Sequence, residues 1–275
     1  MRVAITGAGG QLGSAMRLTT PPEVEAIWLG RADLDITDPE AVAHTASLKG
    51  IDVLINTAAY TAVDAAEDDE AAALLLNGEA PGHLAERCRE EGAHLVQLST
   101  DYVFGPGVPH RPLTPADPTN PDTVYGRSKL RGEQLAGENS TILRTAWVYS
   151  ANTLPEHRDF VSTMLRLEKT HETVTVVADQ HGCPTYAIDL ARAVWEAAQQ
   201  QPGVVQHAVG EGQTTWFELA QAIFAEIGAD PRRITPVTSA EYPARAPRPE
   251  WSVLASDYAL PEWRSALRRA LAAKL

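Results

Sequence analysis

Short apolar strands alternate with helical stretches along the first 150 residues. Runs such as Val3–Thr6 and Ile51–Asn56 carry apolar residues at successive positions, so both of their faces are expected to be buried. Strands buried on both faces are typical of a parallel sheet, because the helices that connect parallel strands cover its two sides. The pattern therefore predicts an α/β fold with a Rossmann-type doubly wound parallel sheet. The expected strands are residues 2–6, 24–29, 51–56, 93–99 and 142–149, and the expected helices begin near residue 11 and residue 39, run over 65–77 and 82–91, and begin again near residue 125.

The C-terminal half predicts a second, smaller lobe. A helix and a strand continue the alternation, so residues 1–150 together with about 189–212 are expected to form the Rossmann lobe. Residues 151–188 and 213–275 would then form a smaller C-terminal lobe folded over the edge of the sheet, and not an independent domain. The later strands are expected at 174–177 and 204–209, and the later helices at 189–199, 216–227 and 263–273.

Six prolines interrupt the alternation between Gly105 and Pro121. They stand at every third position from Pro106 onward. This spacing suits a polyproline II segment, but prolines also stiffen an ordinary loop, which is the interpretation we prefer. Because candidate site residues flank the segment on both sides, a flexible linker between domains is not expected. The sequence leaves open whether this loop closes over a ligand.

Charge and composition exclude several classes of function. The formal net charge of −13 argues against nucleic-acid binding, which needs a basic face. The apolar runs are too short to span a bilayer, and a strand that begins at Arg2 leaves no room for a signal peptide, so we expect a cytoplasmic protein with no membrane association. Cys88 and Cys183 are the only cysteines and form no metal-binding pattern, so no metal is expected.

A glycine-rich turn directly follows the first strand and opens the first helix. Gly7, Gly10 and Gly13 form a GxxGxxG pattern, whereas the GxGxxG fingerprint would need glycine at position 12, which is Leu. Both patterns serve the same physical demand: a tight turn, a backbone that can approach a pyrophosphate closely, and a helix N-terminus aimed at it. The turn therefore predicts a dinucleotide site.

The end of the second strand indicates which dinucleotide binds. An acidic residue there accepts a hydrogen bond from the ribose 2′-hydroxyl of NAD, while a basic residue accommodates the 2′-phosphate of NADP. Arg31 follows the strand and no acid occurs before Asp33, which favours NADPH, with NADH still possible. Asp35 and Ile36 are placed to meet the adenine. The small residues Ala58 and Ala59, after the third strand, would let a cofactor lie against the backbone.

Tyr125, Lys129 and Thr100 form a candidate proton-transfer set. Tyr125 and Lys129 are four positions apart at the start of a helix, so they share one face. Reduction of a ketone requires a proton for the carbonyl oxygen. A nearby ammonium and an oxidised nicotinamide would lower the pKa of a tyrosine toward the working range. The hydroxyl of Thr100, at a strand end, would hold the same oxygen.

Longer stretches around these motifs resemble the dTDP-4-dehydrorhamnose reductase family, a branch of the extended short-chain dehydrogenases/reductases. The resemblance covers essentially the whole chain, and the Asp-Gln-x-Gly-x-Pro-Thr turn is fairly specific to it. The stretches that carry it are AAYTAVD at 58–64, STDYVF at 99–104, VYGRSKL at 124–130, LRTAWVY at 143–149 and DQHGCPT at 179–185.

The resemblance implies an oxidoreductase of nucleotide-sugar metabolism, with a Rossmann lobe and a smaller substrate-binding lobe. It would reduce the C4 ketone of dTDP-4-dehydro-L-rhamnose to dTDP-L-rhamnose with NADPH or NADH. Tyr125 would donate the proton, while Lys129 would hold the nicotinamide ribose and tune Tyr125. Other cofactor contacts carried over by position are Gly10, Gln11, Leu12, Asp35, Ile36, Ala59, Tyr60 and Thr61.

The same resemblance implies contacts to the sugar nucleotide. Thr100, Asp101 and Trp147 would touch the deoxysugar nucleotide, and the neighbouring Tyr102 is included in this set. Arg248 belongs to a late motif of the form Y-P-x-x-A-x-R-P, and we expect it to help bind the diphosphate.

The chain departs from the family at two positions that bear on assembly. Some members carry glutamates that bind a magnesium ion at a dimer interface, and the aligned positions here are Ala15 and Ile188. We therefore expect a monomer or a weak homodimer. The family often has Asn-Ser-x-Leu where this chain has Trp251-Ser252-Val253-Leu254, so the smaller lobe is expected to differ locally.

Two other functions stay open at the level of sequence. The chain could be a 4-ketoreductase for another dTDP-deoxysugar, since such enzymes share these motifs. It could also be a non-catalytic relative that resembles the regulatory subunit of methionine adenosyltransferase. The joint presence of Thr100, Tyr125 and Lys129 argues against the second alternative, which has less need for a proton-transfer set.

Overall fold

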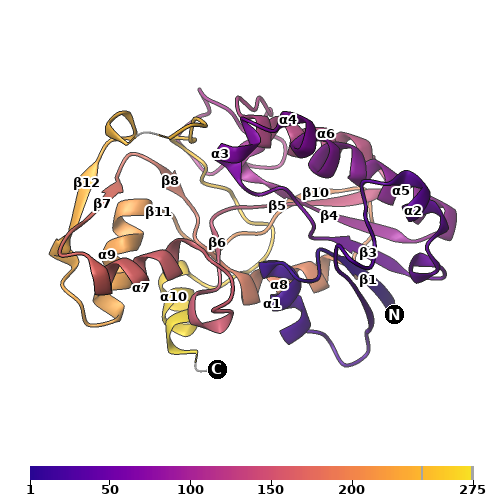
Figure 1. Ribbon diagram of the computed structural model, residues 1–275, viewed down its shortest axis with the longest axis horizontal. Coiled ribbons are helices and arrows are strands. Elements are labelled where there is room, and N and C mark those ends of the chain that lie inside the picture. Colours follow the sequence, from indigo (N-terminus) through magenta and orange to yellow (C-terminus); the bar gives the residue numbers. More distant parts are fainter. Residues whose placement is uncertain (243, 274–275) are drawn as a thin grey trace.

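In the computed structural model, which describes residues 1–242 and 244–273, a six-stranded parallel sheet forms the larger lobe (Figure 1). The strand order is β10-β5-β4-β3-β1-β2. The chain adds β2 on one side of β1 and the later strands on the other side, so the direction of the crossover connections reverses between β1 and β3. Open α/β sheets bind ligands at the carboxyl ends of the strands beside such a switch point. The strands are β1 (Arg2–Thr6), β2 (Glu25–Leu29), β3 (Val53–Asn56), β4 (His94–Thr100), β5 (Ser140–Thr145) and β10 (Val205–His207).

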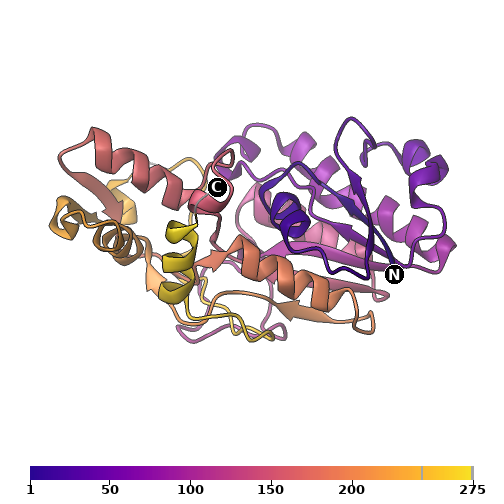
Figure 2. The same ribbon diagram turned by 90° about the horizontal axis from the view of Figure 1, so that it is seen from below.

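Helices cover both faces of this sheet, which confirms the doubly wound α/β prediction (Figures 1 and 2). On one face α1 and α8 pack against each other, and on the other face α5 packs between α2 and α6. The bounds of these helices are α1 (Gln11–Leu18), α2 (Pro39–His44), α3 (Val63–Ala66), α4 (Glu70–Ala73), α5 (Ala80–Glu91), α6 (Val124–Ala136) and α8 (Ala187–Ala197).

The smaller lobe stands beside the sheet at the left of Figure 1 and shares its core. One cluster of buried apolar side chains includes Val3 and Ile5 of the sheet together with Phe224 and Leu267 of the smaller lobe. The two lobes are therefore joined by a continuous apolar core. The elements of this region are β6 (Val148–Tyr149), α7 (Phe160–Thr170), β7 (Val174–Val177), β8 (His181–Gly182), β9 (Thr185–Tyr186), β11 (Thr214–Thr215), α9 (Trp216–Glu226), β12 (Ile234–Val237) and α10 (Trp263–Ala272).

The strand predicted over 142–149 is interrupted at Trp147. This residue has a φ of +46°, a left-handed conformation that a bulky side chain rarely adopts. The chain consequently leaves the main sheet after β5, and the next two residues form β6, which pairs with β9. Residue-by-residue hydrophobicity could not reveal this break, because the residues on both sides of it are apolar.

The helix predicted over 65–77 was also wrong as a single element. The chain forms the short helices α3 and α4 and then a π-helical segment over Leu74–Glu79 that runs into α5. Asp69 begins α4 by accepting a hydrogen bond from the backbone N–H of Ala72 (3.2 Å). The wider turn of the π segment holds Asn77, which is buried and reaches a loop outside the helix.

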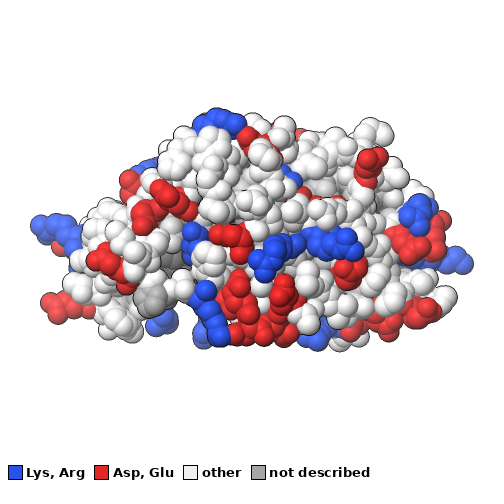
Figure 3. Space-filling model, turned by 90° about the horizontal axis from the view of Figure 1, so that it is seen from above, with Lys and Arg blue, Asp and Glu red and all other residues white. Residues whose placement is uncertain are grey.

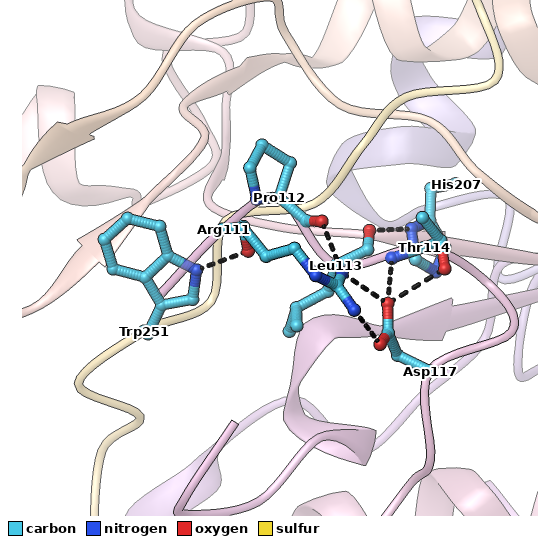
Figure 4. A network of polar contacts seen from close by, with 7 residues as sticks. All are labelled: Arg111, Pro112, Leu113, Thr114, Asp117, His207 and Trp251. Atoms are coloured by element: carbon cyan, nitrogen blue, oxygen red, sulfur yellow. Dashed lines mark hydrogen bonds and ion pairs between the residues drawn. The ribbon is translucent and has the colours of Figure 1, made fainter. Parts of the chain in front are cut away.

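The proline-rich loop over 105–121 is fastened to the C-terminal part of the chain. Leu113 is fully buried, its N–H donates to the Val253 carbonyl (2.8 Å), and its carbonyl accepts from Ala255 (2.8 Å) and from Nδ1 of His207 (3.1 Å). Figure 4 shows the contact between Leu113 and His207, and also Trp251, whose indole N–H donates to the Arg111 carbonyl (2.8 Å). The loop is therefore an ordered, packed segment in this conformation.

Charged side chains of both signs are interspersed on the face that carries α3, α4 and α6 (Figure 3). Arg127 and Arg131 of α6 pair there with Glu70 (3.5 Å) and Glu79 (3.2 Å). Within the described residues no helix is both long and apolar enough to cross a lipid bilayer.

His207 predicts a pH-dependent loss of stability. Burial, followed by the nearby charge of Arg144, lowers the pKa of His207 to about 4. Since the unfolded chain binds the proton near pH 6.5 and the folded chain does not, stability should fall as the pH drops from about 6.5 to about 4, by up to about 3 kcal/mol. His207→Asn keeps a donor at the position of Nδ1 and removes this titration.

Urea unfolding of the wild type and His207→Asn between pH 7.5 and 4.5 tests this expectation. The stability difference between the two proteins should shrink, or reverse, as the pH falls. Asp101, whose pKa burial raises to about 6, titrates in both proteins, so its effect cancels in the difference. A pH-independent difference would contradict the role of His207.

Candidate active site

A large cleft of about 1160 Å³ opens at the carboxyl ends of the sheet strands. It runs from the end of β2, past the glycine turn, to the smaller lobe. All but two of the residues that the sequence singled out line it. Those that do are Gly7, Gly10, Gln11, Leu12, Arg31, Asp35, Ile36, Ala58, Ala59, Tyr60, Thr61, Thr100, Asp101, Tyr102, Tyr125, Lys129 and Trp147; Gly13 and Arg248 do not.

The glycine turn brings the backbone of β1 against neighbouring segments so closely that no side chain fits. Gly7 has a φ of +71°, and a Cβ added there would lie 2.5 Å from the backbone N of Ala58. A Cβ at Gly13 would lie 2.5 Å from the Gly7 carbonyl oxygen, so Gly13 lets α1 rest on the turn. Gly10 precedes α1 without a side-chain cap, and the helix N-terminus borders the cleft. Its free amides suit an anion.

Arg31 lies at the end of the cleft that follows β2. Two carboxylates close to it in the chain, Asp33 and Asp35, accept hydrogen bonds from other residues. Asp33 accepts a hydrogen bond from the Gly30 N–H (2.8 Å). Asp35 accepts from the hydroxyl (2.7 Å) and the N–H (3.0 Å) of Thr37, and these bonds hold the pKa of Asp35 below its usual value. Arg31 forms no ion pair with any described residue. Its charge is therefore available to a phosphate.

Asn77 fixes the loop that follows β3. Its side-chain oxygen accepts from the Tyr60 N–H (2.7 Å), and its amide donates to the Tyr60 carbonyl (3.0 Å) and to Ser128 of α6 (3.0 Å). This positions Ala59, Tyr60 and Thr61 along the cleft. Asn77 was not among the predicted site residues, although an amide within an alanine-rich stretch is a signal visible in the sequence.

Tyr125 and Lys129 lie on the first turns of α6, beside the end of β4. A Cβ at Gly126 would lie 2.2 Å from the Tyr102 carbonyl oxygen, so this glycine allows α6 to approach the turn after β4. The rings of Tyr102 and Tyr125 consequently meet edge to face, with centroids 5.4 Å apart. Lys129 is buried, and its Nζ donates to the Leu98 carbonyl (2.6 Å).

Two stacked indoles form the wall of the cleft on the side of the smaller lobe. Trp147 and Trp216 are nearly parallel, with ring centroids 3.6 Å apart, and Phe160 packs against Trp216 (4.5 Å). A Cβ at Gly182 would come within 2.3 Å of the Trp147 ring, which explains the glycine of the Asp-Gln-x-Gly turn. Trp216 lines the cleft but was missed at the sequence level, because it stands 69 positions from Trp147.

Arg248 lies outside the cleft and is engaged by an acid. Its guanidinium donates to Asp64 (2.8 Å), whose carboxylate also accepts from the Ala246 N–H (3.0 Å), and Arg245 pairs with Asp68. These contacts fasten the late motif to α3 and the turn that follows it. The expected contact between Arg248 and a diphosphate stays a prediction, and it would require Arg248 to leave Asp64.

Comparison with known proteins agrees with this geometry. A family model described as "RmlD substrate binding domain" matches residues 1–275. The chain is 46% identical to the dTDP-4-dehydrorhamnose reductase of Mycobacterium tuberculosis, over 99% of this chain and 93% of that protein. The chain belongs to the dTDP-4-dehydrorhamnose reductase family. This confirms the resemblance inferred from the motifs.

Two further relatives of the family bear on cofactor and substrate. The crystal structure of dTDP-4-dehydrorhamnose reductase from Bacillus anthracis, in complex with NADP, superposes with a TM-score of 0.91 at 33% identity, covering 98% of this chain and 97% of that one. A Streptomyces antibioticus protein named "Probable dTDP-4,6-dihydroxy-2-methyloxan-3-one 4-ketoreductase" is 45% identical over 98% of this chain and 94% of that protein.

In this member of the family, burial governs the protonation of the central pair. Burial raises the pKa of Tyr125 to about 12, and a hydrogen bond with Thr100 opposes that rise. Burial also lowers the pKa of Lys129 to about 8, opposed by Glu133. The predicted depression of the Tyr125 pKa by the ammonium is therefore not found in the protein alone, since burial raises this pKa and Nζ is directed to the Leu98 carbonyl. At neutral pH Tyr125 keeps its proton and Lys129 is mostly charged.

The two positions at which we expected some relatives to carry metal-binding glutamates hold buried apolar residues. Ala15 of α1 and Ile188 of α8 are both buried. In the part of the chain that the structure describes, no group of three or more His, Cys, Asp or Glu side chains is placed to hold a metal ion.

Gly13 offers a test of the close contact between α1 and the turn. Alanine normally stabilises a helix relative to glycine, by about 1 kcal/mol. Because a Cβ at this position meets backbone atoms that cannot move aside, Gly13→Ala should instead lower the free energy of unfolding by about 1–3 kcal/mol. Urea denaturation measures the change.

Gly9→Ala is the matched control. Gly9 belongs to the same turn, has no atom within 4 Å of an added Cβ and does not have a positive φ. Its substitution should change stability by no more than about 0.5 kcal/mol. Equal stability of the two variants would show that the contact at Gly13 is not needed.

Proposed function

We propose that this protein reduces the C4 ketone of dTDP-4-dehydro-L-rhamnose to dTDP-L-rhamnose with NADPH, as its family membership supports. The observation that carries the proposal is the position of Thr100, Tyr125 and Lys129. They line one cleft, between the glycine turn that suits a dinucleotide and the paired indoles of the smaller lobe. This is the order of parts that a reductase of a nucleotide sugar requires.

The residues of the cleft fit a dinucleotide. At the glycine turn, backbone amides and the N-terminus of α1 can meet a pyrophosphate without interference from side chains. Arg31, at the end of β2, would meet the 2′-phosphate of NADPH, and NADH would lack this contact. NADPH would supply a hydride to the ketone carbon.

The chain's own groups would supply the proton and hold the reacting oxygen. We assign Tyr125 as the proton donor, because its raised pKa keeps the phenol protonated at neutral pH. The hydroxyl of Thr100, close to that phenol, would donate to the same carbonyl oxygen and polarise it. Lys129 would orient the nicotinamide ribose once its ammonium leaves the Leu98 carbonyl for the ribose hydroxyls.

The smaller lobe is the proposed binding site for the sugar nucleotide. Trp147 and Trp216 offer a flat apolar surface for a sugar or a thymine ring, and Asp101 and Tyr102 would add polar contacts from the other side. In this proposal residues 1–150 with about 189–212 bind the dinucleotide, and residues 151–188 with 213–275 bind the substrate. Such a division would leave the reacting atoms between the lobes.

A second candidate is reduction of the C4 ketone of another dTDP-deoxysugar. The observation in its favour is the 45% identity to the Streptomyces antibioticus ketoreductase, which nearly equals the 46% identity to the Mycobacterium tuberculosis enzyme. Thr100, Tyr125 and Lys129 would act identically on either sugar. The choice would therefore depend on side chains of the smaller lobe.

We also propose a cytoplasmic protein that is a monomer or a weak homodimer. Ala15 and Ile188 are buried where the family places metal-binding glutamates, which supports assembly without a shared metal. Cys88 and Cys183 are both buried free thiols, which suits a reducing compartment.

Incubation with NADPH and dTDP-4-dehydro-L-rhamnose tests the reaction directly. Loss of absorbance at the nicotinamide band and identification of dTDP-L-rhamnose as product are expected. Turnover of another dTDP-4-keto sugar, with none of this substrate, would favour the second candidate. Binding of NADPH without turnover of any keto sugar would contradict both.

Tyr125→Phe tests the proton donor. Without the hydroxyl, kcat should fall by about 10²- to 10⁴-fold, because the carbonyl oxygen loses its acid catalyst. The NADPH dissociation constant should stay close to that of the wild type, as the ring and its packing on Tyr102 are kept. A variant that lost cofactor binding in proportion to activity would contradict a role confined to proton transfer.

A further inference from the structure

The segment between β6 and α7, residues 150–159, crosses from the smaller lobe to the first helix of the Rossmann lobe. Gln11 of α1 donates from its side-chain amide to Ser150 (2.9 Å) and to Asp159 (3.0 Å). His157 meets the Ser14 hydroxyl through Nε2 (3.1 Å). This segment therefore lies against the first turns of α1, where the glycine turn ends.

Arg158 stands between two residues that make these contacts. His157 and Asp159, its neighbours in the chain, both touch side chains of α1, so the backbone at position 158 is held beside that helix. The Asp159 carboxylate is fixed in turn by the N–H groups of Ser150 (2.7 Å) and Ser162 (2.7 Å), and the bond with Ser162 caps the N-terminus of α7. The position of Arg158 is thus determined by rigid elements on both sides.

The side chain of Arg158 is exposed and lines the cleft. Among the described residues it forms no ion pair. The neighbouring acids already have other partners. Asp159 accepts hydrogen bonds from Ser150 and Ser162, and the Glu156 carboxylate lies 3.5 Å from Nε2 of His157. Its guanidinium is therefore free to bind an anion in the cleft.

A nucleotide ligand needs such a cation in this protein. The chain carries a formal net charge of −13, and the cations that line the cleft are Arg31, Lys129 and Arg158. Arg31 follows β2, and Lys129 is buried with its ammonium on the Leu98 carbonyl. Of these three cations, Arg158 is the one on the segment that is bonded to the first turns of α1. Arginine binds phosphate oxygens through paired N–H groups, which suits a pyrophosphate.

We propose that Arg158 binds the pyrophosphate of the dinucleotide from the side opposite the glycine turn. The inference rests on the proposed NADPH site and adds a residue to it from outside the Rossmann lobe. The pyrophosphate is common to NADPH and NADH, whereas the 2′-phosphate is not. Arg158 and Arg31 should therefore have separable effects on the two cofactors.

The experiment compares Arg158→Gln with Arg31→Gln by titration of NADPH and of NADH, followed through quenching of tryptophan fluorescence. Arg158→Gln should raise the dissociation constants of both cofactors by a similar factor, about 10- to 100-fold, the effect of a lost charge-assisted hydrogen bond. Arg31→Gln should weaken NADPH and leave NADH nearly unchanged. Arg158→Lys should recover part of the affinity.

Arg166→Gln is the matched control. Arg166 is an exposed arginine on α7, eight positions further along, and it does not line the cleft. Its substitution should leave both dissociation constants unchanged. Unfolding temperatures of all variants show whether any change in affinity reflects loss of structure.

Two outcomes would overturn the assignment. Unchanged affinity for both cofactors, with weaker binding of dTDP, would place Arg158 on the substrate diphosphate. Weakening of NADPH alone would place it on the 2′-phosphate. These titrations need no turnover, so a wild type that binds both cofactors but reduces no keto sugar would contradict the proposed function and still allow the assignment of Arg158 to be tested.

Discussion

The contact between the turn at Gly7 and the backbone at Ala58 is the constraint on which the active-site cleft depends. It joins the ends of β1 and β3, the two strands on either side of the switch point. Because neither segment contributes a side chain to the contact, the two strand ends come together and the cleft above them stays open. The same turn sets α1, through Gly13, with its free amides at the border of the cleft. Backbone packing thus forms the amide part of an anion site, to which the cations of the cleft add charge.

That property matters in a chain whose net charge is −13. A dinucleotide and a nucleotide sugar are both anions, so the overall field of the protein opposes their binding. The cleft counters this field with helix amides and with three cations contributed by three different segments. Near the reacting centre, burial has a second effect: it keeps Tyr125 protonated while leaving Lys129 mostly charged at neutral pH. The proposed proton donor therefore carries its proton before any cofactor charge acts on it.

The smaller lobe is placed by backbone features at its border with the sheet. The left-handed conformation of Trp147 directs the chain out of β5, and Gly182 provides the space into which the indole fits. Trp216 then stacks on the same ring. The strained backbone at Trp147 has a structural consequence: it fixes an aromatic surface beside the proposed reacting groups.

The sequence by itself determined the fold class and the family, and it marked the residues on which the proposed chemistry rests. Runs of buried strand residues and helical periodicity are local properties, and so are the spacing of Gly7, Gly10 and Gly13 and the four-residue interval from Tyr125 to Lys129. These patterns can be recognised in the sequence because a strand, a turn or one helix face is built from residues close together in the chain.

Only the tertiary structure decided which distant residues meet. The bond between Gln11 and Asp159 joins positions 148 residues apart, and the bond from Asp64 to Arg248 joins positions 184 apart. Through packing of this kind, Trp216 and Arg158 come to line the cleft, Asn77 fixes a loop beside it, and Arg248 pairs with Asp64. No local sequence pattern encodes such contacts, because they depend on how the helices and strands of the two lobes pack against one another.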